Sequence, residues 1–161
     1  MLFRSLNFSL LLVGNGPEKQ NLERLASELH LHNVRFEPAL PPHEMPGVYR
    51  SADALVFPTL EDVWGLVANE AMLSGLPVLC SVFAGCAHEL FSSENIFNPG
   101  NAEEFRSKLR AAITGKLPPL DRSRLKSTPE LTQDLIQAIE GSLAWPAEII
   151  RDSAVSVSDR T

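Results

Sequence analysis

The sequence predicts an α/β protein with three layers, in which a parallel β-sheet carries helices on both faces. Short, continuous apolar runs alternate along the chain with segments of helical periodicity, and such runs are typical of strands that are buried on both faces. The apolar runs are followed by loops rich in glycine, proline or acidic residues. In parallel sheets the loops at the carboxyl ends of the strands hold the ligand.

The expected strands are the apolar segments at residues 8–13, 34–37, 54–58, 77–81 and 96–97. Helical spacing of apolar residues predicts helices at residues 18–30, 47–51 and 102–114, and a helical turn at residues 88–91. Residues 60–77 should form an acidic loop, a mostly apolar helix and the entry into the next strand. In the two longest amphipathic segments the side chains expected to face inward are Leu22, Leu25, Ala26, Leu29, Phe105, Leu109, Ala112 and Ile113.

The composition of the sequence changes after Gly115, where the predicted alternation of strands and helices ends. Residues 116–127 contain a Pro-Pro pair and mixed charges, as expected of a linker. Residues 128–150 should form a helical segment that begins with a capping threonine and a proline. Residues 151–161 are rich in serine and are expected to be disordered. Residues 1–115 therefore form the predicted folded domain.

Composition restricts the partners and the setting. The chain has 161 residues and a net charge of -6, which argues against nucleic acid or an anionic membrane surface as a partner. It contains two cysteines, Cys80 and Cys86, too few for a disulfide framework or a zinc site of their own. No apolar run approaches the ~20 residues of a membrane span. We therefore expect a reducing, cytoplasmic setting.

The most informative stretch surrounds Glu70, a carboxylate within a mostly apolar helix. An almost wholly apolar helix is expected to be buried, and a buried carboxylate needs a partner or a ligand. The first turn of that helix offers unpaired N–H groups to a diphosphate, and Gly65 leaves room for it. Glu70 lies four residues after Leu66 and could bind ribose hydroxyls, while Asp62 on the loop could hold another polyol. These groups suit a nucleotide-diphosphate sugar. In the alternative interpretation Asp62 caps the helix, and Glu70 pairs with a core Arg, Lys or backbone N–H.

Other candidate sites are weaker. Gly14 and Gly16 follow a strand and open a helix, but Lys19 stands where a dinucleotide fingerprint needs a third glycine. They favour close approach of a ligand to the backbone rather than a nicotinamide site. His30 and His32 are more typical of a surface than of a metal site.

Several motifs resemble the retaining glycosyltransferases of the two-domain GT-B fold, group-1 type. Asp62 and Glu70 match the acid-x7-Glu signature, with Trp64-Gly65-Leu66 between them and Gly75-Leu76-Pro77-Val78 after it. Five further segments match in order and at family spacing: Val13-Gly14-Asn15-Gly16-Pro17, Asn33-Val34-Arg35-Phe36 with Leu40-Pro41, Tyr49 with Asp53-Ala54 and Phe57-Pro58-Thr59, Gly85-Cys86-Ala87 with Glu89-Leu90, and Asn98-Pro99-Gly100-Asn101. The resemblance covers about residues 8–114.

The resemblance implies that residues 1–115 correspond to the C-terminal, Rossmann-like domain that binds the sugar-nucleotide donor, such as a UDP- or GDP-sugar. Asp62 would be the catalytic acid that contacts the transferred sugar, and Glu70 would hold the ribose. Backbone groups near Leu40 would meet the base. The other donor-binding positions would be Gly14, Gly16, Trp64, Gly65 and Leu66. The family needs no metal, and no cofactor is expected.

The resemblance also implies missing parts. The family has an acceptor-binding domain, a first strand in the donor domain, and an Arg and a Lys that grip the diphosphate. This chain matches none of these, and Asp62 stands where the family usually has Glu. We therefore expect a donor half that transfers sugar only when joined to its other half.

The alternatives are a non-catalytic nucleotide-sugar binder, an inactive remnant, or a plain doubly wound domain binding another nucleotide. Exposed apolar surface and a free strand edge would favour self-association.

Overall fold

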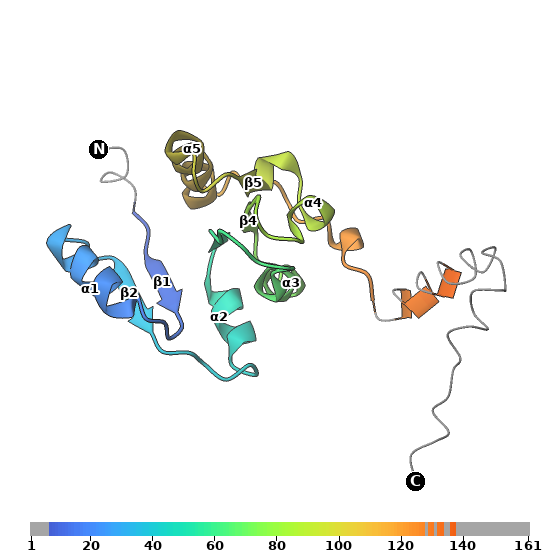
Figure 1. Cartoon of the computed structure of the whole chain (residues 1–161), viewed down its shortest axis with the longest axis horizontal. Helices are drawn as coiled ribbons and strands as arrows, with labels where there is room; N and C mark the ends of the chain where they lie inside the picture. The colour runs from blue at the N-terminus through green and yellow to red at the C-terminus, as the bar shows by residue number, and fades with distance from the viewer. Residues whose placement is uncertain (1–6, 128, 131, 134–135, 138–161) are drawn as a thin grey trace, which may run out of the picture. The chain divides into compact units, whose positions relative to one another are not determined.

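A computed structural model describes residues 7–127, 129–130, 132–133 and 136–137 (Figure 1). The chain divides into two compact units, Met1–Arg124 and Leu125–Thr161. Every strand described here lies in the first unit. The predicted helical segment at 128–150 falls largely outside the described residues, and the predicted tail at 151–161 falls wholly outside them. In the described part of the chain no helix is both long and apolar enough to cross a membrane.

The first unit opens with a β-α-β element. Strand β1 (Leu10–Val13) leads through helix α1 (Lys19–Glu28) to strand β2 (Val34–Glu37). The two strands are parallel, and Leu10 lies opposite Val34. Helix α1 ends two residues earlier than predicted. His30 takes a positive φ of 53°, and the N–H of Leu31 turns back to the carbonyl of Ala26, which closes the helix.

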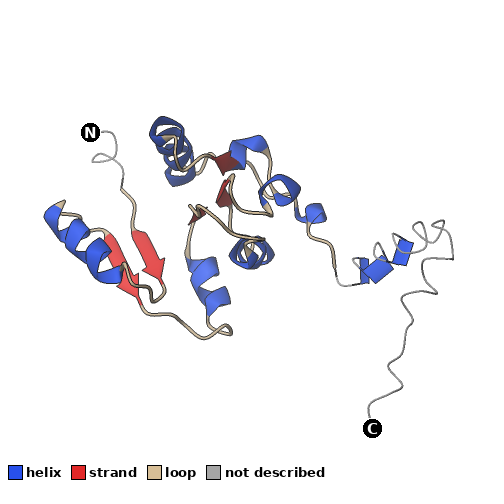
Figure 2. Cartoon of the chain, in the orientation of Figure 1, coloured by secondary structure: helices blue, strands red, loops and turns tan. Residues whose placement is uncertain are grey.

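The next part of the unit continues the alternation of helix and strand (Figure 2). Helix α2 (Met45–Ser51) precedes β3 (Leu55–Phe57), and α3 (Leu66–Leu73) joins β3 to β4 (Val78–Ser81). The remaining elements are α4 (Ala87–Leu90), the 3-10 turn η1 (Ser93–Asn95), β5 (Ile96–Phe97), α5 (Ala102–Ile113) and the 3-10 turn η2 (Arg122–Arg124). Both β3 and β5 pair with β4 in parallel.

The α/β class with parallel strands and flanking helices is confirmed, but the strands form two sheets rather than the single one expected. The order is β1-β2 in one sheet and β3-β4-β5 in the other. The sheets are separate because no described strand pairs with both β1 and β3. The sequence could show which segments are extended, but it could not show which strands pair with one another.

The core lies in the three-stranded sheet. All four residues of β4 are buried, and Leu79, Phe97 and Ala112 form a buried cluster. The ring of Phe97 stacks on Phe105 of α5, with centroids 4.7 Å apart. From α5, Phe105 and Leu109 pack against this cluster and Ala112 belongs to it, so these three residues face inward as predicted. The buried amide of Asn95 donates to the carbonyl of Val78 at 3.0 Å, so a polar residue within the core has its partner.

The β1-α1-β2 element is much less buried than the sequence predicts. Leu10 and Leu11 were expected in a strand covered on both faces, yet they are 40% and 41% exposed. The inward-facing residues expected in α1 are also open to solvent, since Leu22 is 45% and Leu25 47% exposed. The helical periodicity was correct, but the surface that would bury this apolar face is not supplied by the described residues.

Replacing Phe97 by alanine should lower the free energy of unfolding by about 3–5 kcal/mol, because it empties the centre of the core. The matched control is Phe83→Ala, since Phe83 is 47% exposed and should cost about a third as much. Urea titrations followed by circular dichroism measure both. Equal losses for the two variants would contradict this assignment of the core.

Candidate functional site

The acidic loop after β3 and the glycine loop after β4 are held together by backbone hydrogen bonds. Asp62 forms an isolated parallel bridge with Ala84. The N–H of Gly85 donates to the carbonyl of Asp62, and the N–H of Cys86 donates to the carbonyl of Trp64, each at 2.9 Å. Because β3 and β4 are adjacent and parallel, their following loops emerge at the same edge of the sheet. The two loops therefore form one shared platform.

Two glycines allow the two loops to approach this closely. A Cβ at Gly85 would overlap the carbonyl oxygen of Val63. Gly65 has a φ of +92°, and a Cβ there would lie 2.7 Å from the ring of Phe57 and 3.4 Å from the sulfur of Cys86. Both positions are thus restricted to glycine by backbone conformation or by contact.

Helix α3 begins directly at this platform, and its first two backbone N–H groups have no hydrogen-bond partner among the described residues. Gly65 is the N-cap in a left-handed conformation, without any side-chain capping bond. The N–H of Ala68 bonds to the carbonyl of Gly65 at 2.9 Å. Within the described residues, neither the N–H of Leu66 nor that of Val67 donates a hydrogen bond. Such free donors at the positive end of a helix dipole favour an anion.

Asp62 stabilises the turn before the helix instead of capping the helix itself. Its Oδ1 accepts a hydrogen bond from the N–H of Trp64 at 3.0 Å, and the carboxylate is half-buried. The indole N–H of Trp64 donates to the side chain of Asn69 at 2.9 Å. The capping alternative for Asp62 is therefore wrong. These bonds hold the side chains of Asp62 and Trp64 in defined positions beside the helix start.

The expectation that Glu70 is buried is also wrong. Glu70 is exposed, because α3 buries only the face that carries Ala68, Ala71 and Met72. Leu66, one turn earlier, is 69% exposed, so Leu66 and Glu70 share an outward face as their spacing predicts. An almost wholly apolar composition suggested a helix enclosed on all sides, but it could not show which face the fold leaves open.

The partner of Glu70 is Tyr49, which sequence reasoning did not assign to the site. The hydroxyl of Tyr49 donates to Oε2 of Glu70 at 2.7 Å, and Tyr49 is only 4% exposed. Burial, with the hydrogen bond and the charge of Glu70, raises the pKa of Tyr49 well above its usual value. The spacing of Tyr49 from Asp53-Ala54 was the one available signal, since it had already matched a family motif.

The remaining predicted positions follow the carboxyl ends of β1 and β2. Gly14 has a φ of +147°, and its N–H donates to the carbonyl of Glu37 at 3.1 Å. The carbonyl of Gly16 accepts from the N–H of Lys19 at the start of α1, and Leu40 is half-buried after β2. Among the described residues, no hydrogen bond joins these three to the platform around Asp62 and Glu70.

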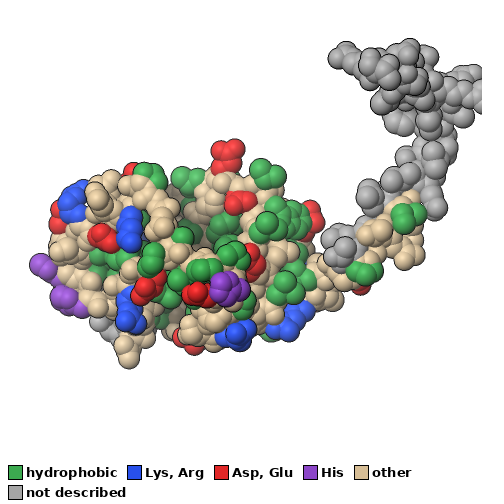
Figure 3. All heavy atoms as spheres, turned by 90° about the horizontal axis from the view of Figure 1, so that it is seen from below, with side chains coloured by type: hydrophobic (Ala, Val, Ile, Leu, Met, Phe, Trp, Pro, Cys, Tyr) green, Lys and Arg blue, Asp and Glu red, His purple; other side chains and the backbone are tan. Residues whose placement is uncertain are grey.

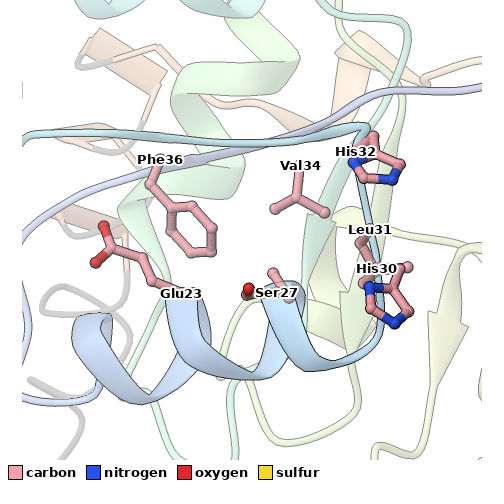
Figure 4. Close-up of a pocket in the computed structure, with 8 residues that line it drawn as sticks. Glu23, Ser27, His30, Leu31, His32, Val34 and Phe36 are labelled. Atoms are coloured by element: carbon pink, nitrogen blue, oxygen red, sulfur yellow. The ribbon is translucent and has the colours of Figure 1, made fainter.

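A cavity of about 380 Å³ lies elsewhere, between α1 and β2. Phe36 and Val34 point from the strand toward α1, and His30 and His32 lie at one end (Figure 4). It contains none of the predicted site residues. In the described part of the chain, no group of three or more His, Cys, Asp or Glu side chains could hold a metal ion. The two histidines therefore have no third ligand there.

Both cysteines lie in the core beneath the platform. Cys80 and Cys86 are fully buried and not disulfide-bonded. The hydrogen bond between their thiols, together with burial, raises the pKa of Cys80 far above its usual value. A protonated, buried thiol is a poor nucleophile. Cys80 is therefore not a candidate nucleophile for this site.

Replacing Gly85 by alanine should lower the free energy of unfolding by about 3 kcal/mol, because the two loops must separate to admit the methyl group. Gly47→Ala is the control. Nothing lies within 4 Å of a Cβ at Gly47, and its position in α2 favours alanine by up to about 1 kcal/mol. Urea unfolding measures both variants, and a tolerated Gly85→Ala would show that the loops are not tightly apposed.

Replacing Tyr49 by phenylalanine should lower the unfolding free energy by about 1 kcal/mol at neutral pH. Unfolded tyrosine loses its proton near pH 10 whereas folded Tyr49 keeps it, so the wild type loses this stability as the pH rises above about 10. Tyr49 is the chain's single tyrosine, and the variant therefore lacks this dependence. The difference between the two unfolding free energies should be constant below about pH 9 and should shrink as the pH rises above about 10; a difference that stays constant there would contradict the bond.

Comparison with known sequences places the chain in a family. The family profile described as "Glycosyl transferases group 1" matches residues 3–129. The sulfoquinovosyl transferase SQD2 of Arabidopsis thaliana is 33% identical over 106 residues, which cover 63% of this chain and 20% of that protein. The D-inositol 3-phosphate glycosyltransferase of Corynebacterium jeikeium is 42% identical over 71 residues, 44% of this chain and 17% of that protein.

Solved structures show the same likeness. WaaG, a glycosyltransferase involved in lipopolysaccharide biosynthesis, matches with a TM-score of 0.58 and 27% identity over 68% of this chain and 30% of its own. The lipopolysaccharide outer core galactosyltransferase WaaB matches in fold with a TM-score of 0.60 at 18% identity, over 68% of this chain and 32% of its own. This chain thus spans between 17% and 32% of the length of these four relatives, and it belongs to the group-1 glycosyltransferases with their GT-B architecture.

Proposed function

We propose that the first unit binds the nucleotide-diphosphate part of a sugar donor, such as a UDP- or GDP-sugar. In this proposal, a glycosyltransferase that contains this region transfers the sugar to an acceptor with retention of configuration. The proposal depends on one observation: the N–H of Leu66 has no hydrogen-bond partner among the described residues, and the exposed carboxylate of Glu70, held by Tyr49, lies on the same face of α3.

The diphosphate is placed at the start of α3. The free N–H groups of Leu66 and Val67 would donate to its oxygens, and the helix dipole favours its charge. The missing side chain of Gly65 lets the start of the helix pack against Phe57 and Cys86, which fixes where these two N–H groups lie. The half-buried Trp64, fixed by Asn69, would border the same space.

The ribose is placed beside Glu70, about 6 Å further along the helix axis than Leu66. Oε2 of Glu70 already accepts from Tyr49, and a carboxylate has lone pairs left to accept from two ribose hydroxyls. The buried hydroxyl of Tyr49 fixes the direction of the carboxylate before the ligand arrives, which lowers the ordering cost of binding. The base would then reach the backbone near Leu40, with Gly14 and Gly16 leaving further room.

Asp62 is proposed to contact the transferred sugar. Its Oδ1 is occupied by the N–H of Trp64, and its second oxygen would accept from a sugar hydroxyl. The side chain is one methylene shorter than the glutamate usual in the family, and the exposed Glu61 could take this role instead. Stabilising the leaving diphosphate requires positive charge, which we expect from an Arg and a Lys outside this chain.

The second candidate is a nucleotide-sugar binder or remnant without transferase activity. It is favoured by the acidic character of the platform, because the hydrogen bonds to Asp62 and Glu70 come from Trp64 and Tyr49 rather than from Lys or Arg. A binder of this kind would retain donor affinity but turn nothing over. Hydrolysis or transfer assays with a sugar nucleotide separate the two candidates.

Calorimetric titration with UDP and with GDP tests the site. At least one should bind in the millimolar range, and Glu70→Ala should weaken binding by about tenfold or more, since it removes hydrogen bonds to a charged group. The control is Glu103→Ala, which removes a carboxylate of the same type from the first turn of α5. Absence of binding by either nucleotide, or equal affinities for the two variants, would refute the proposal.

A further inference from the structure

Trp64, at the end of the acidic loop, is held by hydrogen bonds at three of its atoms. Its backbone N–H donates to Oδ1 of Asp62 at 3.0 Å, and its carbonyl accepts from the N–H of Cys86 at 2.9 Å. Its indole N–H donates to Oδ1 of Asn69 on α3 at 2.9 Å. The side chain of Trp64 is therefore fixed before a ligand arrives, which lowers the ordering cost of binding.

The bond to Asn69 determines what the side chain of Trp64 can offer to a ligand. An indole has one hydrogen-bonding atom, and its N–H can only donate. Because Asn69 uses that donor, the half-buried side chain presents only carbon atoms to the outside. Trp64 is thus suited to packing its ring on an apolar surface and has no side-chain hydrogen bond left for a hydroxyl.

Trp64 lies at the sugar end of the proposed donor site. Its backbone is bonded directly to Asp62, the residue proposed to contact the transferred sugar. The diphosphate is placed at Leu66, two residues later, and the ribose is placed at Glu70, about one turn further along α3. The order along the site is therefore sugar, diphosphate and ribose, with Trp64 between the first two.

A sugar ring can use both kinds of contact at once. Its hydroxyls lie mainly around the rim of the ring, and its faces carry C–H groups. Asp62 has a second carboxylate oxygen that can accept from a hydroxyl, and the carbon surface of Trp64 can pack against the C–H groups of one face. The two residues together therefore fit a sugar ring better than either fits alone.

The charges of the platform favour a neutral sugar. Residues 54–90, which supply β3, the two loops and α3, contain neither Lys nor Arg. Two acids, Glu61 and Asp62, occupy the loop before Trp64, beside the exposed apolar side chains of Leu60 and Val63. Figure 3 shows acidic and hydrophobic side chains beside one another on one face of the first unit. A carboxylate on the sugar would meet like charges there.

We propose that Trp64, held in place by Asn69, packs against the C–H face of the transferred sugar, and that this sugar is a neutral hexose. Asn69 acts through Trp64 and is a positioning residue. The inference rests on the proposed donor site, because the sugar is placed by its diphosphate at the start of α3. It adds an apolar contact at the sugar end and a class of sugar.

The hold on Trp64 is tested without a ligand. Trp145→Phe leaves Trp64 as the only tryptophan, so its indole N–H gives a single NMR signal. Asn69→Leu removes the acceptor at similar size, whereas Asn69→Asp keeps an oxygen in its place. Hydrogen exchange of the indole N–H should be about tenfold faster in Asn69→Leu than in the wild type or in Asn69→Asp. Equal rates in all three would overturn the positioning role.

Calorimetric titration then compares a nucleotide with its sugar ester. UDP-glucose should bind about threefold or more tightly than UDP, and UDP-glucuronic acid should bind more weakly than UDP-glucose. If GDP is the nucleotide that binds, GDP-mannose and GDP-mannuronic acid take their place. Asn69→Leu and Trp64→Leu should each weaken binding of the hexose ester about threefold or more and leave that of the bare nucleotide unchanged. Asn69→Asp should preserve the ratio of the two affinities.

The outcomes separate this inference from the proposed function. If neither UDP nor GDP binds, both fail. If the nucleotide binds but its hexose ester binds no tighter, or if the leucine variants weaken both ligands equally, only this inference fails. Tighter binding of the uronic acid ester would refute the neutral sugar. Circular dichroism confirms that the variants are folded, and Trp64→Leu keeps both backbone bonds of Trp64, so it provides the result even if Asn69→Leu unfolds.

Discussion

The candidate site depends on the backbone contact between the loop after β3 and the loop after β4. The carbonyls of Asp62 and Trp64 accept from the N–H groups of Gly85 and Cys86, and Gly85 leaves no space between the loops. This contact sets where Gly65 enters α3, and therefore where the free N–H groups of Leu66 and Val67 lie. The position of the site is thus set mainly by hydrogen bonds between backbone groups of the two loops.

The two carboxylates of the platform are held by uncharged hydrogen-bond donors. The hydroxyl of Tyr49 and the N–H of Trp64 each hold one oxygen of a carboxylate. A neutral donor fixes the direction of Glu70 or Asp62 without cancelling its charge, so the acid stays available to a polyol. An Arg or Lys in the same place would compete with the ligand for both oxygens. The arrangement is suited to hydroxyl recognition more than to structural ion pairing.

Much of the fold could be predicted from the sequence, because the spacing of apolar residues and the composition of a segment can be read from that segment alone. The strands and helices, the inward face of α5 and the loop-helix start at Gly65 all follow from spacing. Two features could not be predicted in this way. The exposure of Glu70 depends on which side of α3 meets α2 and the sheet, and the division into two sheets depends on which strands pair. Tyr49 and Glu70 are 21 residues apart, and neither residue alone indicates the other.

The exposed apolar residues around the acidic loop are under much weaker packing constraints than the two glycines beside them. Leu60, Val63 and Leu66 are 73%, 95% and 69% exposed, whereas Gly65 and Gly85 tolerate no side chain. Substitutions are therefore confined by packing at the two glycines but almost unconstrained at the three apolar positions beside them. The exposed apolar side chains of this platform can therefore vary widely in sequence while the backbone contact at Gly65 and Gly85 stays the same.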